Sequence, residues 1–301
     1  MSECVLRAEG ISKSFGGVHA LQDASLTVHA GEVVCLAGEN GCGKSTLIKI
    51  ISGYYEPDAG TIELNGIKYT HLTPRESLRA GVQVIYQDFS IFPNLTVAEN
   101  IALSYLLSRN ERHVSRRKMR KIAQNALEQI NVKLPLDAPL ENLSVADKQI
   151  VAITRSLLDN ARMIIMDEPT SALTHKEVQA LFRVVRILKE KGLAILFVSH
   201  KLEEIFDICD QITILNNGRN VISRPIADFD RHNFVYYMTG REYSDERLAR
   251  EVAAQEPLLQ VRNLTMQGYF EDVSFDLYPG EVLGVTGLLG SGRTELALAL
   301  Y

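Results

Sequence analysis

The segment Gly38–Thr46 constrains the fold of this 301-residue chain more than any other part of its sequence. It reads Gly-Glu-Asn-Gly-Cys-Gly-Lys-Ser-Thr, follows the apolar run Glu32–Ala37 and precedes a helical pattern over Lys44–Ile51. Strand, glycine-rich loop and helix, in that order, form the context in which G-x-x-x-x-G-K-[ST] makes a phosphate-binding loop. Glycines let the backbone N–H groups face a phosphate, and the helix points its positive end at it. The segment therefore predicts an α/β fold with a site for nucleotide phosphates.

The side chains of this loop predict ATP and Mg²⁺ as its ligands. Lys44 is placed to bridge β- and γ-phosphates, where it assists catalysis, and Ser45 is placed to hold the magnesium ion. The alternative is a chance match in a glycine-rich turn, which the correctly placed strand and helix disfavour. The predicted nucleotide-binding residues of the loop are Gly38, Glu39, Asn40, Gly41, Cys42, Gly43, Lys44, Ser45 and Thr46.

A pair of acidic residues ends a second apolar run, Met163–Met166. In phosphate-loop ATPases an aspartate at such a strand end supports the magnesium shell, which predicts this role for Asp167. Glu168 is placed to polarise a water for attack on the γ-phosphate. The alternative is a solvated strand end before a turn at Pro169. The presence of the phosphate loop in the same chain favours the metal-linked role.

Further apolar runs bounded by turns predict strands of a mainly parallel central sheet, because strands buried on both faces read as continuous apolar segments. An antiparallel β part is expected at the N-terminus. Residues 88–160 are mostly helical in pattern and predict a helical subdomain inserted in the sheet domain. The remaining predicted strands are Val82–Tyr86, Ala194–Val198 and Gln211–Leu215, and the remaining predicted helices are Lys176–Lys191 and Leu202–Ile208.

The sequence also contains an internal repeat. Ala24–Val33 is similar to Val273–Val282, and the same offset of 249 residues places Arg293 where the first copy has Lys44. We therefore expect one complete domain over residues 1–245, a polar linker over 246–256 and the beginning of a second, incomplete domain over 257–301. A short extension that merely resembles the start is the alternative. A chain of this organisation is expected to be a fragment or a truncated product of a longer protein with two such domains.

Composition excludes several classes of protein. The net charge of −5 gives no general attraction to nucleic acid. The four cysteines form no CxxC pair, which disfavours a zinc site and is typical of the reducing cytoplasm. The sequence has no apolar stretch of about 20 residues, so any membrane role is expected to come through a partner protein. A basic run over residues 109–121 could contact nucleic acid or lipid, although a solvated helical face is the simpler interpretation.

Several motifs around the loop resemble those of ABC ATPases over the length of the first domain. Leu143–Gln149 occupies the place of the family's LSGGQ signature, with Val145, Ala146 and Asp147 in place of Gly, Gly and Gln. The resemblance implies nucleotide contacts from Ser144 of the signature and from Phe15, which would stack on adenine. It implies catalytic roles for His200, the switch histidine, and for Gln87, which would also contact the metal. Ser144 can still cap its helix, with Asp147 completing an approximate capping box.

The second glycine-rich loop, Gly287–Glu295, is similar to that of the C-terminal half of tandem ATPases in simple-sugar importers of the ribose/galactose type. Its arginine keeps the charge of a lysine but changes the geometry, so we expect poor hydrolysis there. The resemblance implies an ATPase that powers sugar import from the cytoplasmic face of the membrane. Its partners would be permease subunits, a periplasmic sugar-binding protein and a second ATPase unit, with no nucleic acid.

Two other functions remain open at this point. An ABC ATPase of translation or DNA repair would not transport, although translation factors carry a long charged linker and repair proteins carry zinc cysteines or coiled coils. The altered signature would also suit a nucleotide-binding module that does not hydrolyse. The sequence does not indicate which sugar moves, because specificity in such systems lies outside the ATPase.

Overall fold

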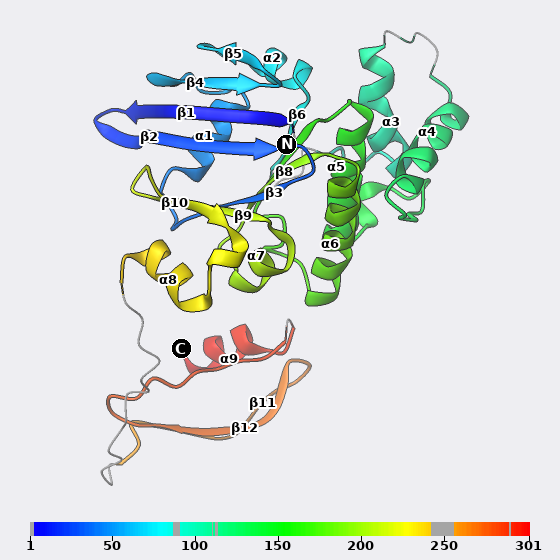
Figure 1. The fold of residues 1–301 in the computed structure, drawn as a ribbon. Helices are drawn as coiled ribbons and strands as arrows, with labels where there is room; N and C mark the ends of the chain where they lie inside the picture. The colour runs from blue at the N-terminus through cyan, green and yellow to red at the C-terminus, as the bar shows by residue number, and fades with distance from the viewer. Residues whose placement is uncertain (1–2, 87–90, 110, 112–113, 242–255, 289) are drawn as a thin grey trace. The chain divides into compact units, whose positions relative to one another are not determined.

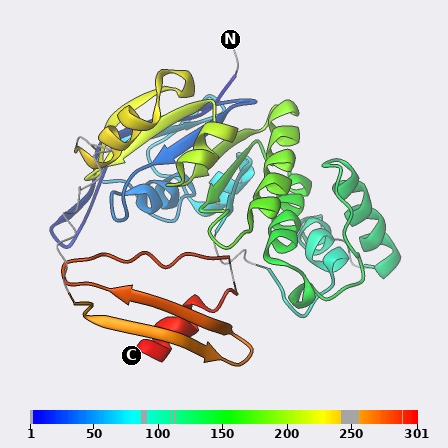
Figure 2. The same cartoon turned by 90° about the horizontal axis from the view of Figure 1, so that it is seen from below.

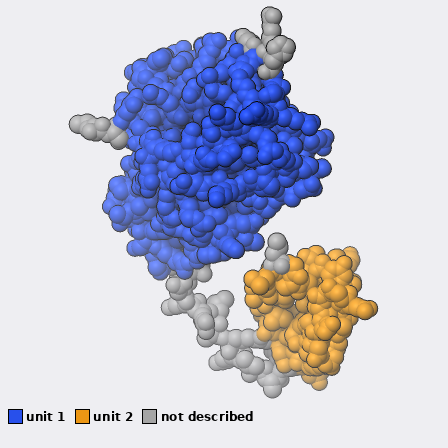
Figure 3. Space-filling view, turned by 90° about the vertical axis from the view of Figure 1, so that its right-hand side faces the viewer, with its two compact units in different colours: residues 1–243 blue, residues 244–301 orange. Residues whose placement is uncertain are grey.

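The computed structural model describes residues 3–86, 91–109, 111, 114–241, 256–288 and 290–301. The chain divides into two compact units, residues 1–243 and residues 244–301 (Figure 3). Nearly all of the predicted linker, residues 246–255, lies outside the described residues. Among the helices that the structure describes, none combines the length and the apolar composition needed to cross a membrane.

The larger unit begins with an antiparallel sheet, which confirms the predicted antiparallel β part at the N-terminus, and its strand order is β2-β1-β4-β5. Its inward face follows from the alternation of residues along β1: Leu6 and Ala8 are buried, whereas Arg7 and Glu9, which alternate with them, are exposed. The strands are β1 (Cys4–Phe15), β2 (Val18–His29), β4 (Ala59–Leu64) and β5 (Ile67–Tyr69).

The second sheet has the strand order β10-β9-β3-β8-β7-β6, and its five strands from β9 to β6 run parallel. This confirms the predicted parallel core, to which β10 adds an antiparallel edge. Every residue of β3 and of β8 is buried, as continuous apolar runs predict. The strands are β3 (Val33–Ala37), β6 (Val82–Ile85), β7 (Met163–Asp167), β8 (Ala194–Val198), β9 (Gln211–Asn216) and β10 (Arg219–Pro225).

The two faces of this sheet belong to different cores. Val34 and Leu36 of β3 join the core shared with the antiparallel sheet and with helix α1 (Lys44–Ile51). Val33 and Cys35 of the same strand join the core beneath the helices of the opposite face. The helices and short 3-10 turns (η) of the first unit outside the helical subdomain, besides α1, are α2 (Pro74–Arg79), α6 (His175–Glu190), α7 (Leu202–Ile208), η2 (Ile226–Asp228) and α8 (Arg231–Thr239).

The predicted helical insertion is confirmed. Helices α3 (Val97–Ser108) and α4 (Arg116–Glu128) pack on each other through Ala102, Leu106 and Met119. The turn η1 (Leu140–Asn142) leads into α5 (Val145–Leu158), which joins this group to the sheet. In two views the teal α3 and α4 lie beyond the green α5 and α6, on the side away from the yellow β9–β10 edge (Figures 1 and 2).

The smaller unit consists of a hairpin followed by an irregular segment and a helix. Strands β11 (Leu259–Met266) and β12 (Phe270–Leu277) pair antiparallel, with Leu259 opposite Leu277. Helix α9 (Arg293–Leu300) begins directly after Gly292, as α1 begins after Gly43. Between β12 and α9 no strand forms among the described residues, because nothing described in this unit offers the pairing that β8 and β9 give to β3.

Candidate functional site

The loop Gly38–Thr46 connects β3 to α1 and wraps around the buried ammonium group of Lys44, whose residue is 8% exposed. Lys44 Nζ donates hydrogen bonds to the backbone oxygens of Gly38 at 2.7 Å and Glu39 at 2.8 Å. The Sγ atom of Cys42 lies 3.8 Å from the same nitrogen. The loop therefore holds its single cation in place at the start of the helix.

Gly43 sets the angle at which α1 leaves the loop. Its φ is 108°, and a Cβ added there would lie 2.5 Å from the backbone oxygen of Ala20. No side chain caps the first turn of α1, so the N–H groups of that turn remain available at the loop. This is the arrangement that binds an anionic group at a helix N-terminus.

A cavity of about 310 Å³ lies over this loop. It brings six of the nine loop residues together with the acidic pair that is more than 120 positions away in the sequence. The lining residues are Ala20, Asn40, Gly41, Gly43, Lys44, Ser45, Thr46, Asp167 and Glu168. The structure therefore places the predicted phosphate loop and the predicted carboxylates in one site.

Asp167 ends β7, and Glu168 begins the turn that follows. Burial and, to a lesser degree, the neighbouring charge of Glu168 raise the pKa of Asp167, while Lys44 acts in the opposite direction. Glu168 has a φ of 47°, in the left-handed region, and its N–H donates to the backbone oxygen of Val198 at 3.1 Å. This turn directs the carboxylate of Glu168 into the cavity.

The oxygen donors in the cavity suit Mg²⁺. The hydroxyl of Ser45 and the carboxylate of Asp167 are hard ligands, and Mg²⁺ in nucleotide sites takes few protein ligands and completes its shell with phosphates and waters. In the described ranges, no cluster of three His, Cys, Asp or Glu side chains that could hold a metal ion exists. Among the residues that the structure describes, these two would contribute to the magnesium shell.

His200 lies at the end of β8, the strand next to β7. Its Nδ1 atom is 3.3 Å from Oε1 of Glu168. The side chain of His200 is 54% exposed and that of Glu168 is 29% exposed. Glu168 lines the cavity, and His200 is connected to it through Glu168. Strands β3, β8 and β7 are adjacent and parallel, which brings the three loops that follow them to one edge of the sheet.

Two further predicted site residues, Phe15 and Ser144, do not line this cavity. Phe15 ends β1 and packs edge-on against Tyr55, with ring centroids 5.1 Å apart. Ser144 caps α5: its Oγ accepts from the N–H of Asp147 at 3.1 Å and donates to the carboxylate of Asp147 at 3.0 Å. Gln87 lies outside the described residues.

Sequence reasoning missed the contribution of Tyr55 to the aromatic surface at Phe15. Tyr54 and Tyr55 stack edge-on, the ammonium of Lys49 lies over Tyr55, and that of Lys13 lies over Phe15. The tyrosine pair directly after the helix of the phosphate loop was a usable signal. It gives an aromatic surface whose Phe15 ring remains 40% exposed.

The fold and the geometry of the site define a phosphate-loop nucleotide-binding domain. The family model described as ABC transporter matches residues 21–171, about half of the chain, and the chain belongs to this family. A crystal structure of a nucleotide-free ATP-binding cassette from an ABC transporter is similar to it, with a TM-score of 0.66 and 28% sequence identity. That similarity covers 74% of this chain and 91% of the other.

Curated relatives include importer proteins. The ribose import ATP-binding protein RbsA 2 of Streptomyces avermitilis is 46% identical, over 99% of this chain and 59% of that protein. The D-allose import ATP-binding protein AlsA of Escherichia coli is 42% identical, over 97% of this chain and 59% of that protein. The chain thus spans about three fifths of the length of these relatives.

Proposed function

We propose that this chain binds ATP with Mg²⁺ and hydrolyses it to power import of a sugar through an ABC transporter. One observation carries the proposal: a single cavity joins the phosphate loop to the two carboxylates, one of which is within 3.3 Å of a histidine. The relatives named for import of ribose and allose support a simple sugar as cargo.

Each residue of the site has a role in this proposal. Lys44 and the loop N–H groups hold the β- and γ-phosphates, and Ser45 and Asp167 hold Mg²⁺, which stabilises the charge that develops on the phosphates. Glu168 accepts a proton from the attacking water, and His200 orients that carboxylate. Phe15 stacks on the adenine ring. Gln87 is proposed to reach the metal and the attacking water.

The site is proposed to be completed by a second ATPase unit. Ser144 lies outside the cavity, at the N-terminus of α5, so it would serve an ATP held by the opposing unit. The linker at 246–256 and the repeat at 257–301, with Arg293 in place of the lysine, support a tandem arrangement in which the second loop hydrolyses ATP poorly. The hydrogen bond between Ser144 and Asp147 is expected to slow turnover by occupying the serine hydroxyl.

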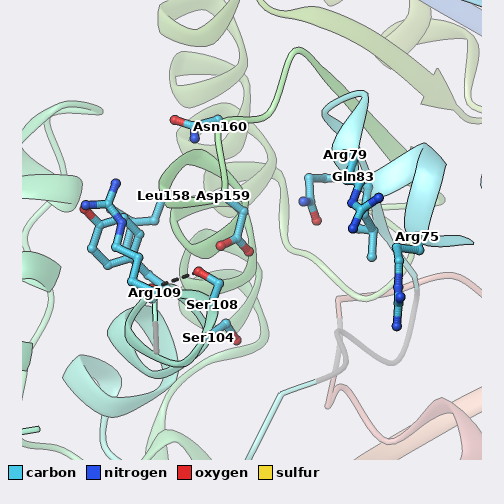
Figure 4. A pocket seen from close by; sticks show the side chains of 11 residues that line it. Arg75, Arg79, Gln83, Ser104, Ser108, Arg109, Leu158, Asp159 and Asn160 are labelled. Atoms are coloured by element: carbon cyan, nitrogen blue, oxygen red, sulfur yellow. Dashed lines mark hydrogen bonds between the residues drawn. The ribbon is translucent and has the colours of Figure 1, made fainter. Parts of the chain in front are cut away.

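A pocket of about 530 Å³ on the first unit is a candidate docking surface for a permease (Figure 4). Arg75 and Arg79 come from α2, and Arg109 follows α3, where its guanidinium stacks on Tyr105. Asp159 contributes the opposing charge, and burial raises its pKa. Because cations predominate in this pocket, the partner segment is proposed to be acidic.

With this docking, the chain is proposed to act at the cytoplasmic face of a membrane, with a periplasmic sugar-binding protein as the third component. Reversing the charge of Arg75 and Arg79 should weaken capture of the chain by its permease. The ATPase activity of the isolated chain should be unchanged, because neither residue lines the nucleotide cavity. Equal capture of the wild type and the variant would refute this surface.

Hydrolysis itself is tested by measuring phosphate release by the wild type and by Glu168→Gln. We expect the variant to bind ATP normally and to lose at least about 100-fold in turnover, because a positioned general base contributes 10²–10⁴-fold. Binding without turnover in the wild type would favour the non-hydrolysing module. Turnover that permeases never stimulate would favour an ABC ATPase of translation or repair.

A further inference from the structure

A buried carboxylate that has no role in the scheme above connects the loops of Glu168 and His200. It belongs to Glu204, near the start of α7. Glu204 is 8% exposed, and the two hydroxyl-bearing residues that it contacts, Thr170 and Ser199, are 2% and 3% exposed. Three polar residues that are each more than nine-tenths buried thus contact one another through the Glu204 carboxylate, and two of them lie within two positions of Glu168 or His200 in the sequence.

The contacts run between the two loops. Thr170 Oγ1 donates to Glu204 Oε2 at 2.5 Å, and Ser199 Oγ donates to the same oxygen at 3.1 Å. Lys201 Nζ lies 3.1 Å from the other carboxylate oxygen and also donates to the backbone oxygen of Thr170 at 2.9 Å. One carboxylate therefore joins a residue two positions after Glu168 to the residue just before His200.

The arrangement is sensitive to the loss of that carboxylate. A buried ionised group is tolerated only when partners satisfy it, and its removal leaves those partners unpaired. Here the hydroxyls of Thr170 and Ser199 would lose their acceptor, and Lys201 would lose its ion pair while keeping its hydrogen bond to the backbone oxygen of Thr170. The loops would then move to regain hydrogen bonds.

The backbone at Glu168 increases this sensitivity. Its φ of 47° is uncommon for a residue with a side chain, and such a conformation persists only where neighbouring contacts hold it. The contacts in question are the hydrogen bond from its N–H to Val198 and the links from Thr170 to Glu204 and Lys201. These contacts tie the turn to residues on both sides of His200: Val198 precedes it, and Lys201 and Glu204 follow it.

We propose that Glu204 is a positioning residue that maintains the relative position of the Glu168 carboxylate and the His200 imidazole. The inference rests on the proposed function, because it assigns Glu204 a part in that hydrolysis. Glu204 acts through the two loops and does not itself line the nucleotide cavity. Misplacement of a catalytic group by about 1 Å costs on the order of 100-fold in rate, so a modest shift of either loop is sufficient.

The test compares Glu204→Gln with Glu203→Gln in the full chain, at a protein concentration at which the wild type turns over ATP. Glu203 is adjacent, and its side chain is 89% exposed with an ion pair to Arg231 at 3.9 Å, so it serves as the matched control. We expect Glu204→Gln to lower kcat about 10- to 100-fold and to change KM less than about twofold, because the phosphate loop is untouched. The control should match the wild type in both constants.

A background lacking the histidine separates positioning from general destabilisation. In His200→Ala, adding Glu204→Gln should lower kcat by less than about twofold, because the arrangement it maintains is already lost. A further tenfold loss would overturn the proposal. Ser199→Ala removes one hydrogen bond to Glu204 and should lower kcat about fivefold at unchanged KM. If Glu204→Gln does not fold, this variant tests the proposal in its place, and an unchanged kcat would overturn it.

The outcomes distinguish a failure of the role of Glu204 from a failure of the proposed ATPase function. If the wild type binds ATP without turnover, the proposed function and the role of Glu204 fail together. If the wild type turns over ATP and Glu204→Gln keeps its kcat, only the role of Glu204 fails.

Discussion

Replacement of Gly43 by alanine offers a quantitative test of how the phosphate loop is built. Gly43 has a φ of 108°, and a Cβ there would lie 2.5 Å from the backbone oxygen of Ala20 and 2.7 Å from Cδ2 of Leu21. Gly41 has a φ of 82°, and a Cβ there would meet nothing within 4 Å. The two glycines share a left-handed backbone and differ in the space beside it.

The free energies of unfolding should differ accordingly. An alanine in the left-handed region costs about 1–2 kcal/mol, which applies to both variants. Overpacking against Ala20 adds about 1–3 kcal/mol for Gly43→Ala alone. We therefore expect a loss of about 2–5 kcal/mol for Gly43→Ala and about 1–2 kcal/mol for Gly41→Ala. The larger loss is a substantial part of the 5–15 kcal/mol typical of folded domains.

Urea unfolding of both variants measures these losses, and titration with a fluorescent ATP analogue measures binding. Gly43→Ala should also weaken binding at least about tenfold, because the clash displaces the first turn of α1 and the N–H groups that face the phosphates. Equal destabilisation of the two variants would refute the reasoning. It would show that backbone conformation alone, and not the contact with β2, requires glycine at position 43.

Three further changes test other parts of the site and fold. Phe15→Ala should weaken ATP binding about tenfold in the same titration, because base stacking contributes about 1–3 kcal/mol; an unchanged Kd would place the adenine elsewhere. Lys44→Ala should abolish detectable binding at micromolar protein, and retained binding would contradict its contact with the phosphates. Hydrogen bonds from the backbone and side chain of Thr174 lower the pKa of the Glu177 carboxyl. The stability that these hydrogen bonds contribute is fully present above the ordinary glutamate pKa of about 4.3, and it is lost as the pH falls through the lowered pKa of the folded protein. Glu177→Ala should therefore destabilise the protein more at pH 7 than at pH 3 in urea unfolding, and a deficit independent of pH would contradict this linkage.

Much of the larger unit was predictable because its strands are buried on both faces. The run Ala194–Val198 was assigned without error, and Lys44–Ile51 was recognised as a helix from its motif and its periodicity. The helix Leu202–Ile208 also matched at both ends, and the other predicted elements differed from the structure by one residue at one end or at both. These features are local in sequence, and a pattern of apolar residues is sufficient to specify them.

The supporting contacts of the site were not predictable in the same way. Glu204 follows Leu202 and Glu203 in a pattern typical of an exposed helical face, yet the fold buries it against Thr170 and Ser199. Tyr55 reaches Phe15 across 40 positions, through the packing of the antiparallel sheet on α1. Such contacts depend on which helices and strands become neighbours in the fold, and a single sequence does not specify those neighbours directly.

The strand order explains why changes at the two ends of the site should affect different kinetic constants. Strand β8 lies between β3 and β7, so the loop of His200 emerges between the phosphate loop and the acidic turn. Glu204 ties that central loop to the acidic turn through Thr170, whereas the phosphate loop is held by its own contacts between Lys44 and the oxygens of Gly38 and Glu39. Displacing the phosphate loop therefore alters ground-state binding of ATP, and releasing the central loop alters the hydrolytic step, because the two depend on separate sets of hydrogen bonds.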